Sequence, residues 1–461
     1  SVAVGTQALS TEDAHGQNVA VGMQALRDLN AGATGNNTAI GHIAGRVMST
    51  GVENTLIGAF AGDALTTGDR NVAVGLGALG SDDVGERSTA VGYAALNAQN
   101  FATSTNSYNT AVGYSAGVSV STGVQNTLIG ANNAIDLSSG NYNTAVGYLA
   151  LFEDEQGSES VAVGYGALQN QKFTTATDSH NTAVGYFAGG NVTTGTNNTF
   201  VGAEAGDGTD DGVSNVAVGH QALSANCGDE NVAIGRQAGL IVTGELNTIV
   251  GTTAGLSITS GDGNTVLGHD AGRGGTDLAT GNNNTLIGRE TGVSAADAAG
   301  QNVLGKGVIG NQDNSFTFGV GTSDTLILAG GTTLSAPSDE RYKEEIQTSA
   351  AGLSFINKLR PVTFKWKKEK DIPSDHRSYV EGSEKRVMLS NGETNHGFIA
   401  QEVKIALEDH PEVKDGCGLW GVDSDGRQRV APAELIPLLT KAIQELSAKN
   451  DALEARIATL E

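Results

Sequence analysis

A short alternation of polar and apolar positions recurs through residues 1–320. Its unit is Asn-Thr-Ala-Val-Gly or a close variant, as at 54–58, 71–75, 143–147 and 284–288. Its closing glycines fall most often 17 residues apart, at positions 5, 22, 41, 58, 75, 92, 113, 130, 147, 164, 185, 202, 219, 235, 251, 268, 288, 305 and 319. A fixed period of this kind is the sequence signature of a repeat architecture.

A period this short does not suit a repeat built of helix pairs, but it fits one coil of a β-solenoid. Each unit supplies a brief Thr-Ala-Val strand, and we interpret its flanking Asn and Gly as turn residues. Neighbouring strand positions point to opposite faces, and both are apolar here, so we expect strands buried on both sides. Longer spacings, such as 92 to 113, predict loop insertions on one edge.

A thin solenoid with few aromatic residues has little apolar surface to bury by itself. We therefore predict that one strand face fills its own coil and that the other meets identical subunits about a threefold axis, the simplest closed arrangement for a fibre. Coils stack about 4.8 Å apart, so the repeat would span on the order of 85 Å. A monomeric solenoid is the alternative.

The composition changes near residues 332–337. All six prolines and both tryptophans lie after residue 336, whereas Lys172 and Lys306 are the only lysines before it. We therefore divide the chain into a repetitive β-roll fibre at 1–320, a linker at 321–337, a domain at 338–430 and a C-terminal helix at 431–461. The predicted fold class is mostly β, with an α+β domain after the fibre.

The net charge of −24 argues against a nucleic-acid partner, because phosphate binding requires clustered Lys and Arg. Cys227 and Cys417 show no metal or disulfide spacing, and we interpret the acidic loop at 207–211 as a solvated turn. No apolar run approaches the ~20 residues of a membrane helix, and no signal peptide is visible. We expect no metal, no cofactor and no membrane insertion. A start at Ser1 without Met is what a fragment of a longer protein would show.

The chain from Ile436 onward carries a heptad pattern, in which apolar residues alternate in steps of three and four. This predicts a coiled coil with Asn450 at an a position, where a buried Asn fixes register and oligomeric state. The pattern does not separate a dimer from a trimer, and a helix packed on its own domain is the alternative. The seam consists of Ile436, Leu439, Ile443, Leu446, Asn450, Leu453, Ile457 and Leu460.

The repeat resembles the β-roll heads of trimeric autotransporter adhesins, which carry Asn-Ser-Val-Ala-Ile-Gly at similar spacing. This resemblance covers about residues 1–320 and implies a left-handed, parallel, trimeric roll.

Three motifs follow the fibre in a fixed order: Ser-Asp-Glu-Arg-Tyr-Lys at 338–343, a stretch rich in apolar residues at 352–366, and His-Gly-Phe-Ile-Ala-Gln-Glu-Val at 396–403. Together with the terminal helix they resemble the intramolecular chaperone domain at the end of phage endosialidases, tail spikes and neck appendages. The family's Ser-Asp-x-Arg-Leu-Lys motif has Tyr342 in place of its Leu. This exchange of an aliphatic for an aromatic residue should leave the chemistry intact.

The resemblance implies that Ser338 is a nucleophile and Lys343 its base, in a Ser-Lys dyad that cuts its own chain between Pro337 and Ser338. Such a protein is a single-turnover serine endopeptidase, and we expect no activity on other substrates. A further set of residues is expected to support the site or merely to build the fold: Asp339, Arg341, His396, Gln401 and Glu402.

The function expected from these features is that of a phage tail fibre or appendage, located in the virion and attached to a host surface glycan or protein. Its chaperone would drive trimerisation and then release itself. The alternative is a bacterial cell-surface trimeric adhesin with the same chaperone. An enzyme acting on host polysaccharide is less favoured, because the repeat offers no unique pair of carboxylates.

Overall fold

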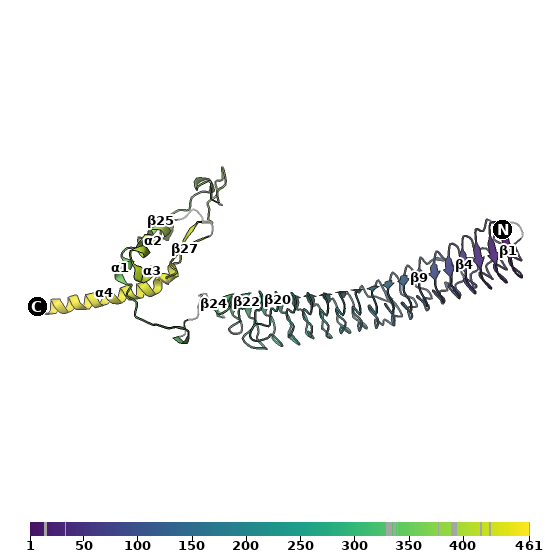
Figure 1. The fold of residues 1–461 in the computed structure, drawn as a ribbon, viewed down its shortest axis with the longest axis horizontal. Coiled ribbons are helices and arrows are strands. Elements are labelled where there is room, and N and C mark those ends of the chain that lie inside the picture. Colours follow the sequence, from purple (N-terminus) through teal and green to yellow (C-terminus); the bar gives the residue numbers. More distant parts are fainter. Residues whose placement is uncertain are drawn as a thin grey trace. The chain divides into compact units, whose positions relative to one another are not determined.

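The computed structural model describes the chain except for residues 13–15, 33, 329–333, 335–337, 339, 377, 389–393, 415, 416, 424, 425 and 461. Two compact units divide the chain, Ser1–Pro337 and Ser338–Glu461 (Figure 1). Each unit has its own apolar core.

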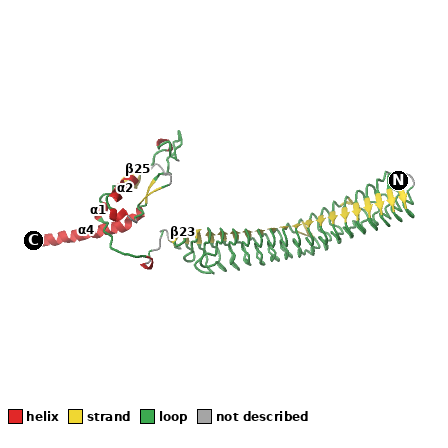
Figure 2. Cartoon of the chain, in the orientation of Figure 1, coloured by secondary structure: helices red, strands yellow, loops and turns green. Residues whose placement is uncertain are grey.

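The first unit is a parallel β-solenoid, in which each coil adds one short strand to a single long sheet (Figure 2). Equivalent residues of successive coils pair in register, as Ala145 does with Ala162. The predicted parallel solenoid is thereby confirmed. Its strands are β1 (Val2–Val4), β2 (Val19–Val21), β3 (Thr38–Ile40), β4 (Thr55–Ile57), β5 (Val72–Val74), β7 (Thr89–Val91), β9 (Thr110–Val112), β10 (Thr127–Ile129), β11 (Thr144–Val146), β13 (Val161–Val163), β15 (Thr182–Val184), β16 (Thr199–Val201), β17 (Val216–Val218), β18 (Val232–Ile234), β19 (Thr248–Val250), β20 (Thr265–Leu267), β21 (Thr285–Ile287), β22 (Asn302–Lys306) and β23 (Phe316–Val320).

Strand β24 (Ser323–Ile327) follows β23 and pairs with it in the antiparallel direction. It lies in the stretch that the sequence indicated as a linker, so regular structure continues past residue 320. Two of the longer coils each add a short strand that pairs with the coil before it. In these, β8 (Thr105–Asn106) pairs with β6 (Gly85–Glu86), and β14 (Thr177–Asp178) pairs with β12 (Gly157–Ser158).

Side chains alternate across each strand, because neighbouring strand residues point to opposite faces. In β9 the middle residue, Ala111, is fully buried inside the coil, whereas Thr110 and Val112 point outward and remain partly exposed. The expectation of a strand buried on both sides is therefore not met within one chain. A single coil has one interior, and the outward apolar residues line its surface.

The Asn that precedes most of these strands is buried and is not a surface turn residue, contrary to our interpretation of the sequence. The backbone N–H of Asn126 donates to Oδ1 of Asn109 at 2.9 Å, and Asn143 donates to Asn126 in the same way at 2.9 Å. The Nδ2 of Asn126 also donates to the Gly140 carbonyl at 2.9 Å. A buried amide needs partners for both its donors and its acceptor, and this asparagine ladder supplies them by joining successive coils.

A second buried column lies seven residues after the closing glycines, and an Asp–Gln pair interrupts its apolar residues twice. Asp82 and Gln99 lie between Leu65 and Val120, and Gln99 Nε2 donates to Asp82 Oδ2 at 2.6 Å. The same pair recurs four coils later as Asp154 and Gln171, at 2.7 Å. Backbone N–H groups also donate to both carboxylates, Gly85 to Asp82 and Gly157 to Asp154, each at 3.0 Å. These two aspartates are fully buried carboxylates in a largely apolar column.

Burial raises the pKa of Asp82 to about 6, although hydrogen bonds from Gln99 and Gly85 oppose the shift. The folded pKa exceeds that of the unfolded chain, so the folded state holds this proton to higher pH. Stability should therefore fall as pH rises from about 4 to about 6, by about 3 kcal/mol for this group. In Asp82→Asn that decrease should be missing. Urea unfolding of both proteins between pH 4 and 7 measures it, and an equal pH dependence in the two would contradict the assignment.

The second unit folds around one small apolar core. Its buried residues come from the stretch before α1, from the helices, and from the segment that leads into β27, and they include Phe355, Val403, Leu407 and Leu419. The elements are η1 (Glu340–Tyr342), α1 (Leu353–Ile356), β25 (Val362–Phe364), η2 (Glu369–Asp371), β26 (Asn395–Gly397), α2 (Ala400–Glu408), α3 (Pro411–Lys414), β27 (Trp420–Val422), β28 (Gln428–Val430), η3 (Pro432–Glu434) and α4 (Leu435–Ala458). Strands β25 and β26 form one antiparallel pair, and β27 and β28 form another.

Helix α4 has two apolar faces. Leu435, Leu438 and Ala442 are buried, and the helix packs against α1, where Glu445 Oε2 accepts from the N–H of Leu353 at 2.8 Å. The heptad seam that the sequence indicated points away from this contact, with Ile436 and Ile443 about two-thirds exposed. The helix therefore packs on its own domain through one face and leaves the other uncovered.

Candidate functional site

Ser338 and Lys343 are in contact where the second unit begins. Lys343 Nζ donates to Ser338 Oγ at 2.8 Å, within hydrogen-bond reach for a nucleophile and its base. Both side chains are exposed in the single chain. The structure thus brings together the two residues expected to carry the chemistry.

A single helical turn makes this contact possible. An extended chain separates residues five apart by about 17 Å. Here η1 shortens that path, and the N–H of Lys343 donates to the Glu340 carbonyl at 3.0 Å. The reactive pair therefore depends on one turn that follows the nucleophile directly in the chain.

The other residues expected at the site lie in several places. Pro337, on the other side of the expected cleavage bond, and Asp339 lie outside the described residues. Arg341 belongs to η1 and is exposed. His396 lies in β26 opposite Thr363, and Gln401 is exposed on the first turn of α2.

Glu402 is held by Arg360, a residue that the sequence did not single out. Arg360 Nε donates to Glu402 Oε2 at 3.0 Å, and a second nitrogen of the guanidinium donates to Oε1. The hydrogen bonds from Arg360 hold the pKa of Glu402 below its usual range. Exposed pairs of this kind contribute little to stability, so its main effect is to fix α2 relative to the chain before β25.

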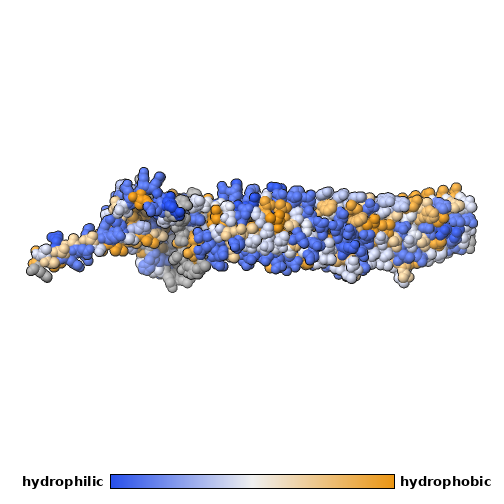
Figure 3. Space-filling view, turned by 90° about the horizontal axis from the view of Figure 1, so that it is seen from below, coloured by the Kyte–Doolittle hydropathy of each residue, from blue (hydrophilic) through white to orange (hydrophobic). Residues whose placement is uncertain are grey.

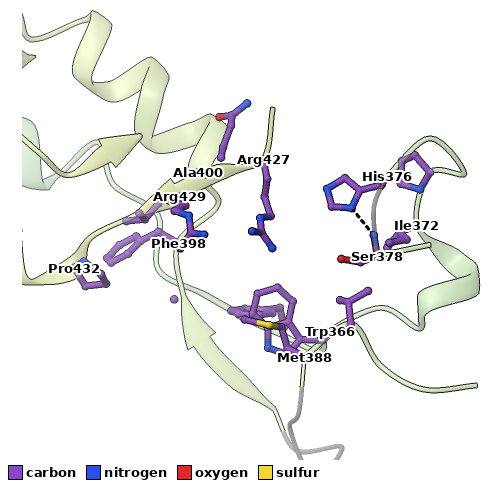
Figure 4. A pocket seen from close by; sticks show the side chains of 16 residues that line it. Trp366, Ile372, His376, Ser378, Met388, Phe398, Ala400, Arg427, Arg429 and Pro432 are labelled. Carbon is purple, nitrogen blue, oxygen red and sulfur yellow. Dashed lines mark hydrogen bonds between the residues drawn. The ribbon is translucent and has the colours of Figure 1, made fainter. Parts of the chain in front are cut away.

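A cleft of about 600 Å³ lies elsewhere in the second unit (Figure 4). Phe364, Trp366 and Phe398 give it an aromatic lining, and Arg427 extends into it, with Met388 beside Trp366. Neither Ser338 nor Lys343 lines it. Sequence reasoning missed this cleft because its walls come from five separate segments, and only two of these, at 364–366 and 397–400, belonged to motifs already noted.

No group of three or more His, Cys, Asp or Glu side chains within the described part of the chain is placed to hold a metal ion. Among the helices that the structure describes, none is long and apolar enough to cross a membrane.

Taken together, a long parallel solenoid followed by a small α+β unit with a Ser-Lys contact at its first residue defines a fibre-like protein with a separate C-terminal domain. Residues 338–410 match the family model described as chaperone of endosialidase. The chain therefore carries a chaperone-of-endosialidase domain, as the resemblance indicated. The match begins at Ser338, the residue where the second unit begins. The family consists of self-cleaving intramolecular chaperones and is classed among the peptidases. No curated protein matches the chain.

Proposed function

We propose that this chain is a trimeric phage tail fibre or appendage protein for host attachment, whose C-terminal domain drives assembly and then cuts itself off between Pro337 and Ser338. The observation that carries the proposal is the 2.8 Å contact from Lys343 Nζ to Ser338 Oγ at the boundary of the two units. The chaperone family and the solenoid both support a fibre.

The cutting step follows from the chemistry of the pair. A neutral Lys343 amine takes the proton of the Ser338 hydroxyl, and Oγ attacks the carbonyl carbon of Pro337. The C–N bond to Ser338 breaks, its nitrogen leaves as an amine after gaining a proton, and an ester joins Pro337 to Oγ. Water then hydrolyses the ester. The products are a fibre that ends at Pro337 and a chaperone that begins at Ser338.

Assembly supplies the condition for this step. A lysine accepts a proton only when it is neutral, and removal from water or a nearby cation favours the neutral form. Both residues are exposed in one chain, so we propose that neighbouring subunits of the trimer cover them and remove them from water. Cleavage then follows assembly and removes the unit that would guide refolding. A fibre that cannot refold after unfolding is stabilised by its slow rate of unfolding, which is kinetic stability.

A chaperone is needed because the repeats are so similar. Parallel strands of three chains must find one register, and a shift by one coil gives a nearly equivalent pattern. The uncovered seam, from Ile436 in α4 to Leu460 just after its end, offers three chain ends a place to associate before the solenoid forms, with Asn450 fixing their alignment.

The test is the intact mass of the purified protein beside its Ser338→Ala variant, with sedimentation to measure the oligomeric state. From the wild type we expect two fragments, one that ends at Pro337 and one that begins at Ser338. From the variant we expect one full-length chain, and both proteins should be trimers. If both chains stay whole in a verified trimer, the domain assembles the fibre without cutting it and the dyad assignment is wrong.

A further inference from the structure

The outward face of the solenoid sheet carries an uncharged strip along its whole length. In every three-residue strand of this sheet the first residue is Thr or Val and the third is Val, Ile or Leu. These strand positions carry no charge although residues 1–337 contain 29 Asp and Glu and nine Lys and Arg. Ile57, Ile129, Ile234 and Leu267 are 36 to 44% exposed on it. Apolar patches are visible at several points along the solenoid in Figure 3.

The size of this strip marks it as an interface. At about 85 Å long and about 10 Å wide, it covers on the order of 800 Å², above the few hundred Å² usual on a monomer and equal to one side of a standard interface. An occupant that covers all of it must repeat with the rise of one coil. A second copy of this chain has that repeat by construction.

Two rims border the strip, and in five coils the trailing rim is a tyrosine and the leading rim is aromatic or charged. The trailing rim is the residue after each closing glycine, and the leading rim is the residue before each buried Asn or Ser. In the coils named next, the side chains of both rims are exposed or partly exposed. In these coils the trailing rim has Tyr93, Tyr114, Tyr148, Tyr165 and Tyr186, and the leading rim has Arg87, Tyr108, Tyr142, Glu159 and His180.

Contacts within one chain already align each rim along the solenoid. Tyr93 stacks on Tyr114 with ring centroids 5.1 Å apart, and Tyr165 stacks on Tyr186 at 5.3 Å. These tyrosines are 44 to 56% exposed. Stacked rings partly cover one another's faces, so they present edges and hydroxyls to the surroundings. Such a surface suits side chains of a neighbouring protein better than a sugar ring, which stacks on an open aromatic face.

The residues on the two rims of one coil are complementary. Arg236 on the trailing rim shares its coil with Glu230 on the leading rim, and Tyr93 shares its coil with Arg87. Symmetry about an axis along the fibre places the trailing rim of one copy against the leading rim of the next. With no axial shift, equal coils meet and these pairs form between chains.

We propose that the trailing and leading rims of neighbouring copies meet coil by coil, and that their aromatic and charged pairs set the axial register of the fibre. The proposal rests on the proposed trimer and names its contacts. A shift by one coil would place Arg236 opposite Ser214 or Leu246, and Glu230 would lose its arginine partner. A shift by four coils would bring the segment with the Asp82–Gln99 pair beside the similar segment with the Asp154–Gln171 pair, but it would place Tyr93 opposite Glu159 where Arg87 belongs.

Cysteine cross-linking of the full chain tests the register. The variant Tyr108→Cys with Tyr114→Cys, in a Cys417→Ser background, has one cysteine on each rim of the same coil. Within one chain these lie about 20 Å apart, too far for a disulfide, so a link joins two chains. The matched control, Gln125→Cys with Tyr114→Cys, is offset by one coil.

We expect covalent trimers from the first pair and none from the offset pair on a non-reducing gel. A trimer by sedimentation that links only through the offset pair, or through neither, overturns the register proposal and leaves the trimer standing. A monomer by sedimentation overturns both.

A charge exchange gives a second measurement that needs no disulfide. Arg236→Glu should place a second carboxylate beside Glu230 of the next copy and lower the melting temperature of the assembled fibre. Adding Glu230→Arg should restore it. If the double variant melts no higher than the single variant, the two residues are not partners.

Discussion

The Lys343→Arg variant should fold, assemble and remain uncleaved. Arginine keeps a cation within reach of the Ser338 hydroxyl, where Lys343 Nζ now donates at 2.8 Å. It stays protonated in proteins, however, and so cannot accept the hydroxyl proton. Loss of a nucleophile's base typically lowers the rate by on the order of 10³-fold or more. Intact mass after a fixed incubation measures the uncut fraction.

The comparison with Ser338→Ala makes this variant informative. If Lys343 only positions the turn after Ser338, arginine should replace it and cleavage should continue at a similar rate. Continued cleavage in Lys343→Arg together with none in Ser338→Ala would keep the nucleophile and remove the base assignment. Circular dichroism and sedimentation of both variants show whether the fold and the assembly are unchanged.

The Gly113→Ala variant should destabilise the solenoid by about 3 kcal/mol or more. Gly113 has φ +145°, a conformation that residues with a Cβ rarely adopt. An added Cβ would also lie 2.2 Å from the carbonyl oxygen of Gly130 in the next coil. Neither backbone can move away without breaking the ladder of strands, so the loss should appear as a lower melting temperature and as new proteolysis near this coil.

A second glycine in the same unit provides the control. Gly32 also has a positive φ, +63°, but an added Cβ there would meet nothing within 4 Å. Gly32→Ala should therefore cost only the conformational strain, about 1 kcal/mol. Equal melting temperatures for the two variants would show that the contact between coils is not what requires glycine at position 113.

The period of the glycines was enough to predict a parallel solenoid, because a short strand and a closing turn in every unit leave few other arrangements. The role of the asparagines was not predictable in the same way. Asn126 looks like a turn residue in its own segment, and its partners, Asn109 and Gly140, lie in other coils. The polar pair Asp82–Gln99 was missed for the same reason, since its two members are one coil apart.

The candidate site was predictable where it is local. Ser338 and Lys343 lie five residues apart, and one helical turn joins them. Their spacing alone did not indicate a reactive pair, and the expectation came from the three motifs that together resemble the chaperone family. The partner of Glu402 was not predictable, because Arg360 is 42 residues away in the sequence and reaches Glu402 only through the fold. The aromatic cleft around Trp366 depends on the same kind of long-range packing.

The asparagine ladder has a consequence for how such a protein changes length. Its rungs are the same whether a coil has 16 residues, as from Asn215 to Asn231, or 20, as from Asn264 to Asn284, with N–H to Oδ1 distances of 2.9 and 3.0 Å. The ladder registers coils and is insensitive to the number of residues between them. Peptides grafted into the loop of a coil therefore leave the strands aligned, which makes this fibre a rigid scaffold for displaying foreign sequences at regular intervals.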